Sequence, residues 1–252
     1  MPAVPPKPSE RIVAVIPARL ASTRLPNKVL REIAGEPMLA WVYRAAKACA
    51  QLDQVLIATD SDEVLAFARS RAFAAVLTSP DCASGSDRVH EVAQSVPADI
   101  YVNIQGDEPM LRPEHLDALL SPMTRPGVEV TTLSTRCAPD QIANPNAVKV
   151  VTAANGRALY FSRATIPYDR DRTGDAICYK HLGIYAYRRS ALQRFPSLPA
   201  SRLEVIERLE QLRFLENGID VYVTETPFDT IGVDTEEDLK AVEAILTQAQ
   251  KT

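Results

Sequence analysis

The segment "IPARLASTRLPNK", residues 16–28, carries the positive charges of Arg19, Arg24 and Lys28 but contains no acidic residue and no glycine. It continues the apolar run "RIVAVI", so we expect a loop directly after a buried strand. Two guanidinium groups, an ammonium group and the free N–H groups of a loop suit a triphosphate. The alternative is a solvated basic loop that pairs with surface acids.

Two acidic motifs could hold a metal ion near such a phosphate. "NIQGDEP", residues 103–109, puts Asp107 after a glycine at an expected strand end, and "GVDTEED", residues 232–238, contains Asp234. A few carboxylates together with substrate phosphates are typical ligands of Mg²⁺. In the alternative interpretation Asp107 caps a turn, and Asp234 is the N-cap of the last helix with Glu237 completing a capping box.

Other polar motifs could contact a nucleotide or a small polar molecule. "ASGSDR", residues 83–88, offers hydroxyl and N–H groups to a base or ribose, or it simply caps a helix. In "HLGIY", His181 and Tyr185 share a strand face with Gly183 between them, which leaves space for a small ligand. The alternative for His181 is a satisfied core histidine.

Three further candidates stand in polar surroundings. Arg163 lies in "YFSRATIPYDRD", and Glu210 and Gln211 lie in "RLEQLR". The two residues of the second motif could equally face solvent on their helix.

The elements that must position these residues alternate along the first half of the chain. Strands are predicted at 11–18, 54–60, 74–79 and 99–109, and helices at 37–50, 61–72, 84–96 and 112–123. This alternation indicates a parallel sheet covered by helices on both faces. Ligands of such sheets bind at the carboxyl ends of the strands, so the cationic loop and "QGDEP" should face one cleft.

The pattern changes after residue 125. Strands are predicted at 128–136, 147–153, 157–164, 181–189 and 219–226, and helices at 201–218 and 234–249. The long helix at 201–218 is amphipathic and is closed by Gly218.

Composition excludes several classes of protein. The 252 residues carry a net charge of -4 with a pI of about 5.5, which argues against a general nucleic-acid binder. No apolar run is long enough to span a membrane, and the proline-rich residues 1–10 read as a flexible lead-in without a secretory signal. The nine glycines form neither of the usual glycine-rich phosphate loops, and four scattered cysteines suit a reduced cytoplasm.

Taken together, the motifs resemble the 3-deoxy-manno-octulosonate cytidylyltransferase (CMP-Kdo synthetase) family. They occur in family order from about residue 11 to 245: "IPARLASTRLPNK", "ATDSDEV", "SGSDRVHEV", "VNIQGDEPM", "NPNAVKVV", "ALYFSRATIPYDRD", "KHLGIYAYR", "LEQLRFLENG" and "GVDTEEDL". The first motif is shared widely among sugar nucleotidyltransferases, whereas the "ALYFSRA" and "HLGIY" segments favour the sugar acid Kdo.

The resemblance implies an α/β, Rossmann-like nucleotidyltransferase fold with a mainly parallel sheet and a β-rich dimerisation lobe. We expect one domain over residues 11–252, with a CTP-binding half (11–125), a β-rich sugar-binding and dimerisation region (126–200) and closing elements (201–252). It also implies a cytoplasmic homodimer that uses Mg²⁺ to convert CTP and Kdo into CMP-Kdo and pyrophosphate for lipopolysaccharide or capsule synthesis.

The resemblance further assigns the candidate residues to roles. Catalysis falls to Lys28, Arg19, Asp107 and Asp234, of which the two aspartates hold Mg²⁺. CTP contacts are Arg19, Lys28, Ser84, Gly85, Arg88 and Gln105, and sugar contacts are Gln105, Arg163, His181, Tyr185, Glu210 and Gln211. Alternatives are a synthetase for 8-amino-Kdo or a sialic-acid-like sugar, or a nucleotide-binding regulator without turnover. The joint presence of Lys28, Asp107 and Asp234 argues against the regulator.

Overall fold

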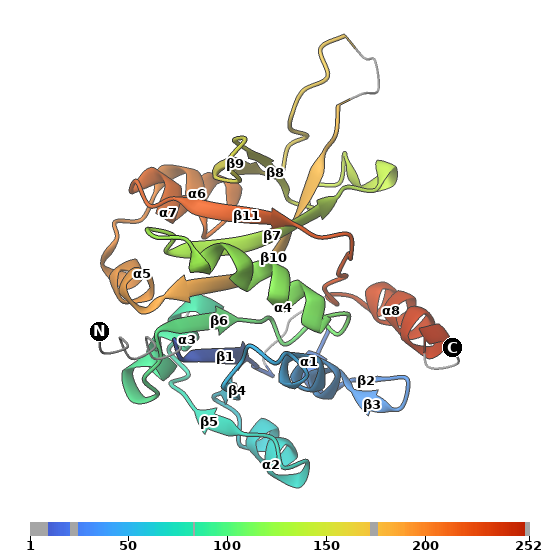
Figure 1. The fold of residues 1–252 in the computed structure, drawn as a ribbon. Helices are drawn as coiled ribbons and strands as arrows, with labels where there is room; N and C mark the ends of the chain where they lie inside the picture. The colour runs from blue at the N-terminus through green and yellow to red at the C-terminus, as the bar shows by residue number, and fades with distance from the viewer. Residues whose placement is uncertain (1–9, 21–24, 83, 172–175, 250–252) are drawn as a thin grey trace, which may run out of the picture.

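The computed structural model describes residues 10–20, 25–82, 84–171 and 176–249, and its centre is a nine-stranded sheet. Seven strands follow one another in the order β11-β7-β10-β6-β1-β4-β5, from the top to the bottom of Figure 1. Their bounds are β1 Ile12–Pro17, β4 Gln54–Thr59, β5 Ala75–Leu77, β6 Ile100–Asn103, β7 Val130–Arg136, β10 Tyr179–Arg188 and β11 Val221–Glu225. β8 (Lys149–Thr152) branches from β10 and pairs with β9 (Ala158–Ser162).

The expected mainly parallel sheet is confirmed. β1 pairs in parallel with both β4 and β6, and β4 does so with β5. β10 runs antiparallel between β6 and β7, and β11 is parallel to β7. Because β10 joins the two groups of strands, the β-rich second half extends the first sheet rather than forming a separate one.

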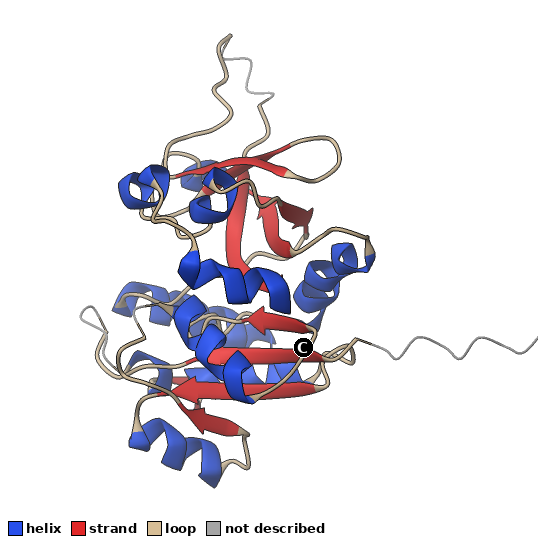
Figure 2. Cartoon of the chain, turned by 90° about the vertical axis from the view of Figure 1, so that its left-hand side faces the viewer, coloured by secondary structure: helices blue, strands red, loops and turns tan. Residues whose placement is uncertain are grey.

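Helices cover both faces of the sheet, as Figures 1 and 2 show from two directions. On β1, Ala14 and Ile16 pack toward one core, whereas Val13 and Val15 pack toward the other, because side chains alternate along a strand. The first core takes α1 (Met38–Lys47), α2 (Asp62–Ser70) and α4 (Pro113–Leu120); the second takes α3 (Gly85–Ser95), α5 (Arg189–Arg194) and α7 (Leu212–Glu216).

The last helix, α8 (Glu236–Ala249), packs away from the two main cores. Its Leu239 and Val242 join Leu25, Ile33 and Met38 in a third apolar cluster beside the short hairpin β2 (Glu32–Ile33) and β3 (Glu36–Pro37). This packing brings the chain just before α8 next to the segment around Lys28. No helix within the described ranges is long and apolar enough to cross a membrane.

The single helix expected over residues 201–218 is wrong. Two short helices, α6 (Arg202–Glu207) and α7, are separated by residues 208–211, and the first of these, Arg208, has a left-handed φ of 52°. A continuous helix would use the carbonyls of Glu207 and Arg208 internally. Here they accept hydrogen bonds from the Arg163 guanidinium at 2.7 and 3.3 Å instead. The break therefore comes from a contact with a distant part of the chain.

Candidate active site

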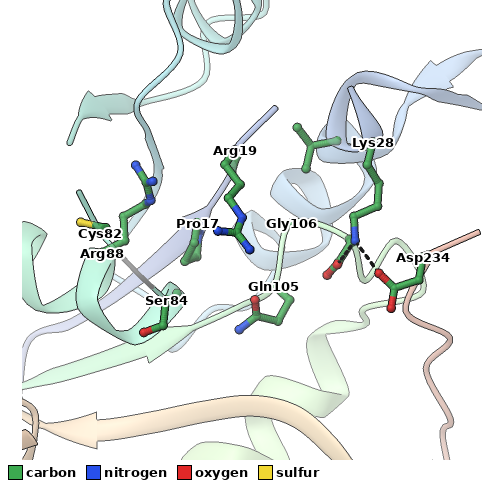
Figure 3. Close-up of a pocket in the computed structure, with 13 residues that line it drawn as sticks. Pro17, Arg19, Lys28, Cys82, Ser84, Arg88, Gln105, Gly106 and Asp234 are labelled. Carbon is green, nitrogen blue, oxygen red and sulfur yellow. Dashed lines mark hydrogen bonds and ion pairs between the residues drawn. The ribbon is translucent and has the colours of Figure 1, made fainter. Parts of the chain in front are cut away.

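A hollow of about 430 Å³ opens at the carboxyl ends of β1 and β6, which is where the strand pattern predicts a ligand. Figure 3 shows Lys28 and Asp234 on one side, Ser84 and Arg88 on the other, and Arg19 and Gln105 between them. The hollow is lined by Pro17, Ala18, Arg19, Lys28, Val29, Cys82, Ser84, Gly85, Arg88, Gln105, Gly106, Asp107 and Asp234. Thus the cationic segment, the "QGDEP" turn and the helix start at 84 meet in one place.

The turn after β6 depends on Gly106. A Cβ atom at this position would lie 2.8 Å from the Pro17 carbonyl oxygen, closer than real Cβ contacts allow. Glycine therefore lets the turn pass against the end of β1. This close approach brings Asp107 to the floor of the hollow opposite Lys28.

Lys28 joins the two carboxylates that the sequence places 127 residues apart. Its Nζ donates to Asp107 Oδ2 at 2.5 Å and to Asp234 Oδ1 at 2.9 Å. Burial lowers the pKa of Lys28, but the charges and hydrogen bonds of the two aspartates outweigh it and raise the pKa above its ordinary value. The ammonium group is therefore charged, and it holds both carboxylates around one point.

Asp234 is not the helix cap of the alternative interpretation. Thr235 Oγ1 accepts a hydrogen bond from the Asp238 N–H at 3.2 Å, and Asp238 Oδ2 accepts one from the Thr235 N–H at 2.9 Å. The capping box therefore falls on Thr235 and Asp238, one residue later than that interpretation has it. This leaves the Asp234 carboxylate directed toward Lys28.

The other predicted nucleotide contacts line the same hollow. Arg19 is exposed there, whereas Arg24 lies outside the described residues. Ser84 caps α3, since its Oγ accepts from the Asp87 N–H at 3.2 Å, and Ser84 and Gly85 at the start of the helix both line the hollow. The capping interpretation of Ser84 and a ligand-binding role are thus compatible.

Arg88 is more enclosed than a typical phosphate ligand. Its side chain is 3% exposed and donates to Asp60 Oδ2 at 3.0 Å and to the Thr78 hydroxyl. These contacts fix the guanidinium at the wall of the hollow. Gln105 closes the floor, and a Cβ on Gly85 would lie 3.5 Å from its amide.

A second hollow, of about 530 Å³, adjoins the first. The two share Asp107 and Asp234, so the carboxylate pair forms their boundary. The other lining residues are Glu108, Gln141, Asn144, Asn146, Ala147, Val148, Arg163, Lys180, His181, Leu182, Gly183, Thr230, Ile231, Gly232, Thr235 and Asp238. A molecule in each hollow would meet at the two aspartates.

His181 lies at the inner wall of the second hollow. Its Nε2 is 2.9 Å from the Thr132 hydroxyl, and its ring packs edge-on against Phe161 at a centroid distance of 5.0 Å. Burial lowers the pKa of His181 to about 3, so the ring is neutral near pH 7. A neutral imidazole can bind a sugar hydroxyl but does not supply positive charge.

Three predicted sugar residues line neither hollow. Tyr185, Glu210 and Gln211 lie deeper, on the face of the sheet that α3 and α7 cover. Within the described structure Gln211 Nε2 is buried without a hydrogen-bond partner. The Tyr185 hydroxyl is also buried and points toward Thr132 without forming a hydrogen bond of good geometry. Orphaned buried polar atoms of this kind mark a place that suits a polar ligand.

Glu210 contacts the start of α3, the helix whose first residues line the first hollow. Its Oε2 accepts a hydrogen bond of 2.5 Å from the hydroxyl of Ser86, in the first turn of α3. Burial raises the pKa of Glu210, and the Ser86 hydroxyl partly opposes that rise.

Arg163 is held by main-chain carbonyls. Its Nε, Nη1 and Nη2 donate to the carbonyls of Glu207, Pro145 and Arg208 at 2.7, 3.0 and 3.3 Å. Three of the five guanidinium N–H groups are used in these bonds. The side chain is therefore fixed in place at the rim of the second hollow.

Glu108 and Lys180 also line the second hollow, although no sequence pattern marked either residue as a candidate. Burial and the adjacent Asp107 raise the pKa of Glu108 to about 7, and its Oε2 has no hydrogen-bond partner among the described residues. Lys180 Nζ donates to Asp229 Oδ1 at 2.9 Å and to the Thr230 carbonyl at 2.7 Å. In the sequence, Glu108 follows Asp107 and Lys180 precedes His181. This adjacency to a predicted site residue was the only feature of the sequence that could have identified them.

A cationic hollow at strand ends, without a glycine-rich phosphate loop, suits the triphosphate substrate of a nucleotidyltransferase. The same fold occurs in the solved 4-diphosphocytidyl-2C-methyl-D-erythritol synthase of Anaerococcus prevotii, with a TM-score of 0.66 at 13% identity over 95% of this chain and 99% of that one. The chain belongs to the cytidylyltransferase family, whose model matches residues 13–223, and within it to the 3-deoxy-manno-octulosonate cytidylyltransferases.

Two curated relatives and one solved structure establish that narrower group. The 3-deoxy-manno-octulosonate cytidylyltransferase of Acidobacterium capsulatum is 69% identical over 243 residues, covering 96% of this chain and 99% of that protein. The protein of the same name from Koribacter versatilis is 60% identical, covering 96% and 95%. A CMP:2-keto-3-deoxy-manno-octonic acid synthetase solved in complex with CTP has a TM-score of 0.91 and 43% identity, covering 95% and 99%.

Proposed function

We propose that this protein transfers CMP from CTP to the anomeric 2-hydroxyl of Kdo, giving CMP-Kdo and pyrophosphate. The observation that carries the proposal is the position of Asp107 and Asp234 at the boundary of two adjoining hollows. One hollow has the cations and helix N-terminus that suit a triphosphate, and the other has the polar lining that suits a sugar. The names of the relatives agree with both substrates.

The donor set at the boundary fits Mg²⁺. Asp107 and Asp234 already hold one positive group, the Lys28 ammonium, between their oxygens. Hard carboxylate oxygens completed by phosphate oxygens and water are what Mg²⁺ prefers in proteins. We infer that these two aspartates hold the ion, which when bound would neutralise phosphate charge.

The chain's own residues would then position and stabilise the reacting groups. Lys28 and Arg19 donate to the phosphate oxygens on which negative charge develops as pyrophosphate leaves. Ser84 and Gly85 at the start of α3, together with Gln105, would contact the nucleotide. The sugar hydroxyl attacks the α-phosphorus opposite the leaving pyrophosphate, so no protein nucleophile is required.

We assign the second hollow to the sugar because of its polar lining. Arg163 lies at the rim of the second hollow, where two further guanidinium N–H groups would suit the sugar carboxylate. His181 is the inner contact, and the unpaired Gln211 amide and Tyr185 hydroxyl are suited to sugar hydroxyls behind it. Because these two atoms are buried and their residues line neither hollow, the sugar would contact them only if the wall of the second hollow opened toward the layer under α3.

Pyrophosphate release tests the proposed reaction. Purified protein would be incubated with CTP and Mg²⁺ and, in separate reactions, with Kdo, 8-amino-Kdo or sialic acid. We expect release with Kdo at a rate far above that with sialic acid. Preference for 8-amino-Kdo would change the substrate, and no release with any of the sugars would overturn the proposed function.

We also propose that the protein is a homodimer that associates through its β-rich part. Leu159 on β9 and Val205 and Ile206 on α6 are 53%, 67% and 68% exposed, so three aliphatic side chains of these elements face solvent in the single chain. The two elements adjoin, because Glu207 accepts hydrogen bonds from the hydroxyls of Tyr160 and Ser162 on β9. A twofold interface through β9 and α6 would cover these exposed aliphatic side chains with the same elements of a second copy.

A further inference from the structure

Lys149 on β8 is among the largest fully buried side chains of the described structure, with 0% exposure. Its Nζ donates to the Asn144 carbonyl at 2.8 Å and to the Arg163 carbonyl at 2.9 Å. Among the described residues no carboxylate forms an ion pair with it, and burial lowers its pKa. Burying an ammonium group with only carbonyl partners costs free energy. The cost indicates that these contacts have a further role.

The two carbonyls belong to opposite parts of the wall of the second hollow. Asn144 lies in the irregular segment between β7 and β8, and Arg163 directly follows β9. Neither carbonyl is within a strand, so the sheet ladder does not supply their donors. The Lys149 ammonium donates to both carbonyls and ties the two parts of the wall together.

The Arg163 side chain completes this arrangement. Its Nη1 donates to the Pro145 carbonyl at 3.0 Å, next to the Asn144 carbonyl that Lys149 holds. Two successive carbonyls of one wall are thus each bound by a cation. Lys149 also donates to the main-chain carbonyl of the second cation, Arg163.

We propose that Lys149 is a positioning residue for the acceptor sugar, which rests on the proposed function of the second hollow. It touches no substrate; it fixes the Asn144 wall and the main chain of Arg163 so that the Arg163 guanidinium stands at one place on the rim. Asn144 and Arg163 line the second hollow and do not line the first. The effect should therefore fall on the sugar and leave the nucleotide unaffected.

Steady-state kinetics of a Lys149→Met variant test the proposal, because Met preserves the length of the side chain but removes the charge and the donors. We expect the KM for Kdo to rise by about tenfold or more, since a small displacement of a positioning group is costly to an enzyme. The KM for CTP should remain within about twofold of wild type. Lys149→Arg, which keeps the charge and the donors, should restore part of the affinity for Kdo.

A matched control comes from β7. Thr131→Val removes another fully buried donor, a hydroxyl that donates to the Leu119 carbonyl at 2.8 Å on a residue that lines neither hollow. It should leave both KM values unchanged. An unchanged KM for Kdo in Lys149→Met would overturn the proposal. Equal rises in both KM values, or loss of CTP binding measured by calorimetry, would also overturn it, because either result would show that Lys149 only maintains the fold.

A second measurement does not depend on the sugar. The Ala147 N–H donates to the Asn144 carbonyl at 3.2 Å, so its hydrogen exchange reports opening of the wall. Exchange should be faster in Lys149→Met than in wild type, and equal rates would refute the positioning role. If wild type releases no pyrophosphate with Kdo while this exchange difference is present, the proposed function fails and the positioning of the wall stands.

Discussion

The Ser86 hydroxyl donates a hydrogen bond of 2.5 Å to Glu210 across a sequence separation of 124 residues. Ser86 is in the first turn of α3, whose N-terminus faces the first hollow. Glu210 precedes Gln211, whose buried amide has no partner among the described residues. One hydrogen bond thus links the helix that we assign to the nucleotide with the residues that we assign to the sugar.

Removing this link should impair use of the sugar. A Ser86→Ala variant removes the hydroxyl that donates to the Glu210 carboxylate, and loss of a hydrogen bond to a charged group costs about 1.5–3 kcal/mol. We expect the KM for Kdo to rise roughly tenfold or more and the pKa of Glu210 to rise further. Ser95→Ala, in the last turn of the same helix, is the matched control and should have wild-type kinetics. Equal kinetics in both variants would refute the role of Ser86.

Asp107→Asn tests the metal assignment. The amide keeps the shape of the side chain but removes the charge that Mg²⁺ requires, so magnesium-dependent turnover should fall by about 10³-fold or more. The melting temperature should stay close to that of wild type, because Asp107 is partly exposed in its ion pair with Lys28. Asp220→Asn, which removes a carboxylate from an exposed ion pair with Arg157, serves as the control. Near-normal activity of Asp107→Asn would remove this residue from the metal site.

A Lys28→Met substitution should make the thermal stability of the protein depend more strongly on Mg²⁺. Without the ammonium, Asp107 and Asp234 repel each other across the point they now share. We therefore expect the variant to have a lower melting temperature than wild type without Mg²⁺ and to be stabilised more than wild type by adding Mg²⁺. Thermal unfolding at several Mg²⁺ concentrations measures this directly. If Mg²⁺ stabilises both proteins equally, Lys28 and the ion do not occupy the same carboxylates.

The buried imidazole of His181 should make stability depend on pH. Its pKa of about 3 in the folded protein lies below the ordinary value of 6.5, so between these values the unfolded chain binds the extra proton. The free energy of unfolding should therefore rise with pH across that window and level off above about pH 6.5. His181 should account for about 2 kcal/mol of the change between pH 5 and pH 6.5.

Urea unfolding of His181→Asn at pH 5 and pH 7 isolates this contribution. The difference in unfolding free energy between the two pH values should be smaller than in wild type by about 2 kcal/mol. Phe161→Leu, a change in the aromatic neighbour of His181, should lower stability by the same amount at both pH values. An unchanged difference in His181→Asn would show that the ring binds its proton equally well in the folded protein.

The exposed aliphatic side chains on β9 and α6 allow the proposed dimer to be tested by mutation. Ile206→Asp puts a charge in the proposed interface, where an unpaired buried carboxylate is strongly unfavourable. Light scattering during gel filtration should then give the mass of one chain rather than two. Ile245→Asp, at an aliphatic side chain on α8 that is 41% exposed, should keep the mass of the wild type. A wild-type protein that already elutes as a monomer would refute the dimer.

The sequence by itself determined the elements and the type of chemistry. Short apolar runs and helical periodicity are local properties, so the strands, most helices and the parallel order followed from them. The loop containing Arg19 and Lys28 and the glycine before Asp107 indicated a phosphate site for the same local reason. The resemblance carried by "HLGIY" and its neighbouring segments supplied the sugar.

Only the tertiary structure decided which side chains meet. Lys28 joins Asp107 to Asp234 because α8 packs on the cluster around Leu25 and Met38, a contact between distant segments that no local pattern encodes. The break at Arg208 has the same origin, since the guanidinium of Arg163 takes carbonyls that a helix would otherwise use. Periodicity describes how one segment can fold, whereas burial, orphaned polar atoms and the two adjoining hollows arise only when segments pack together.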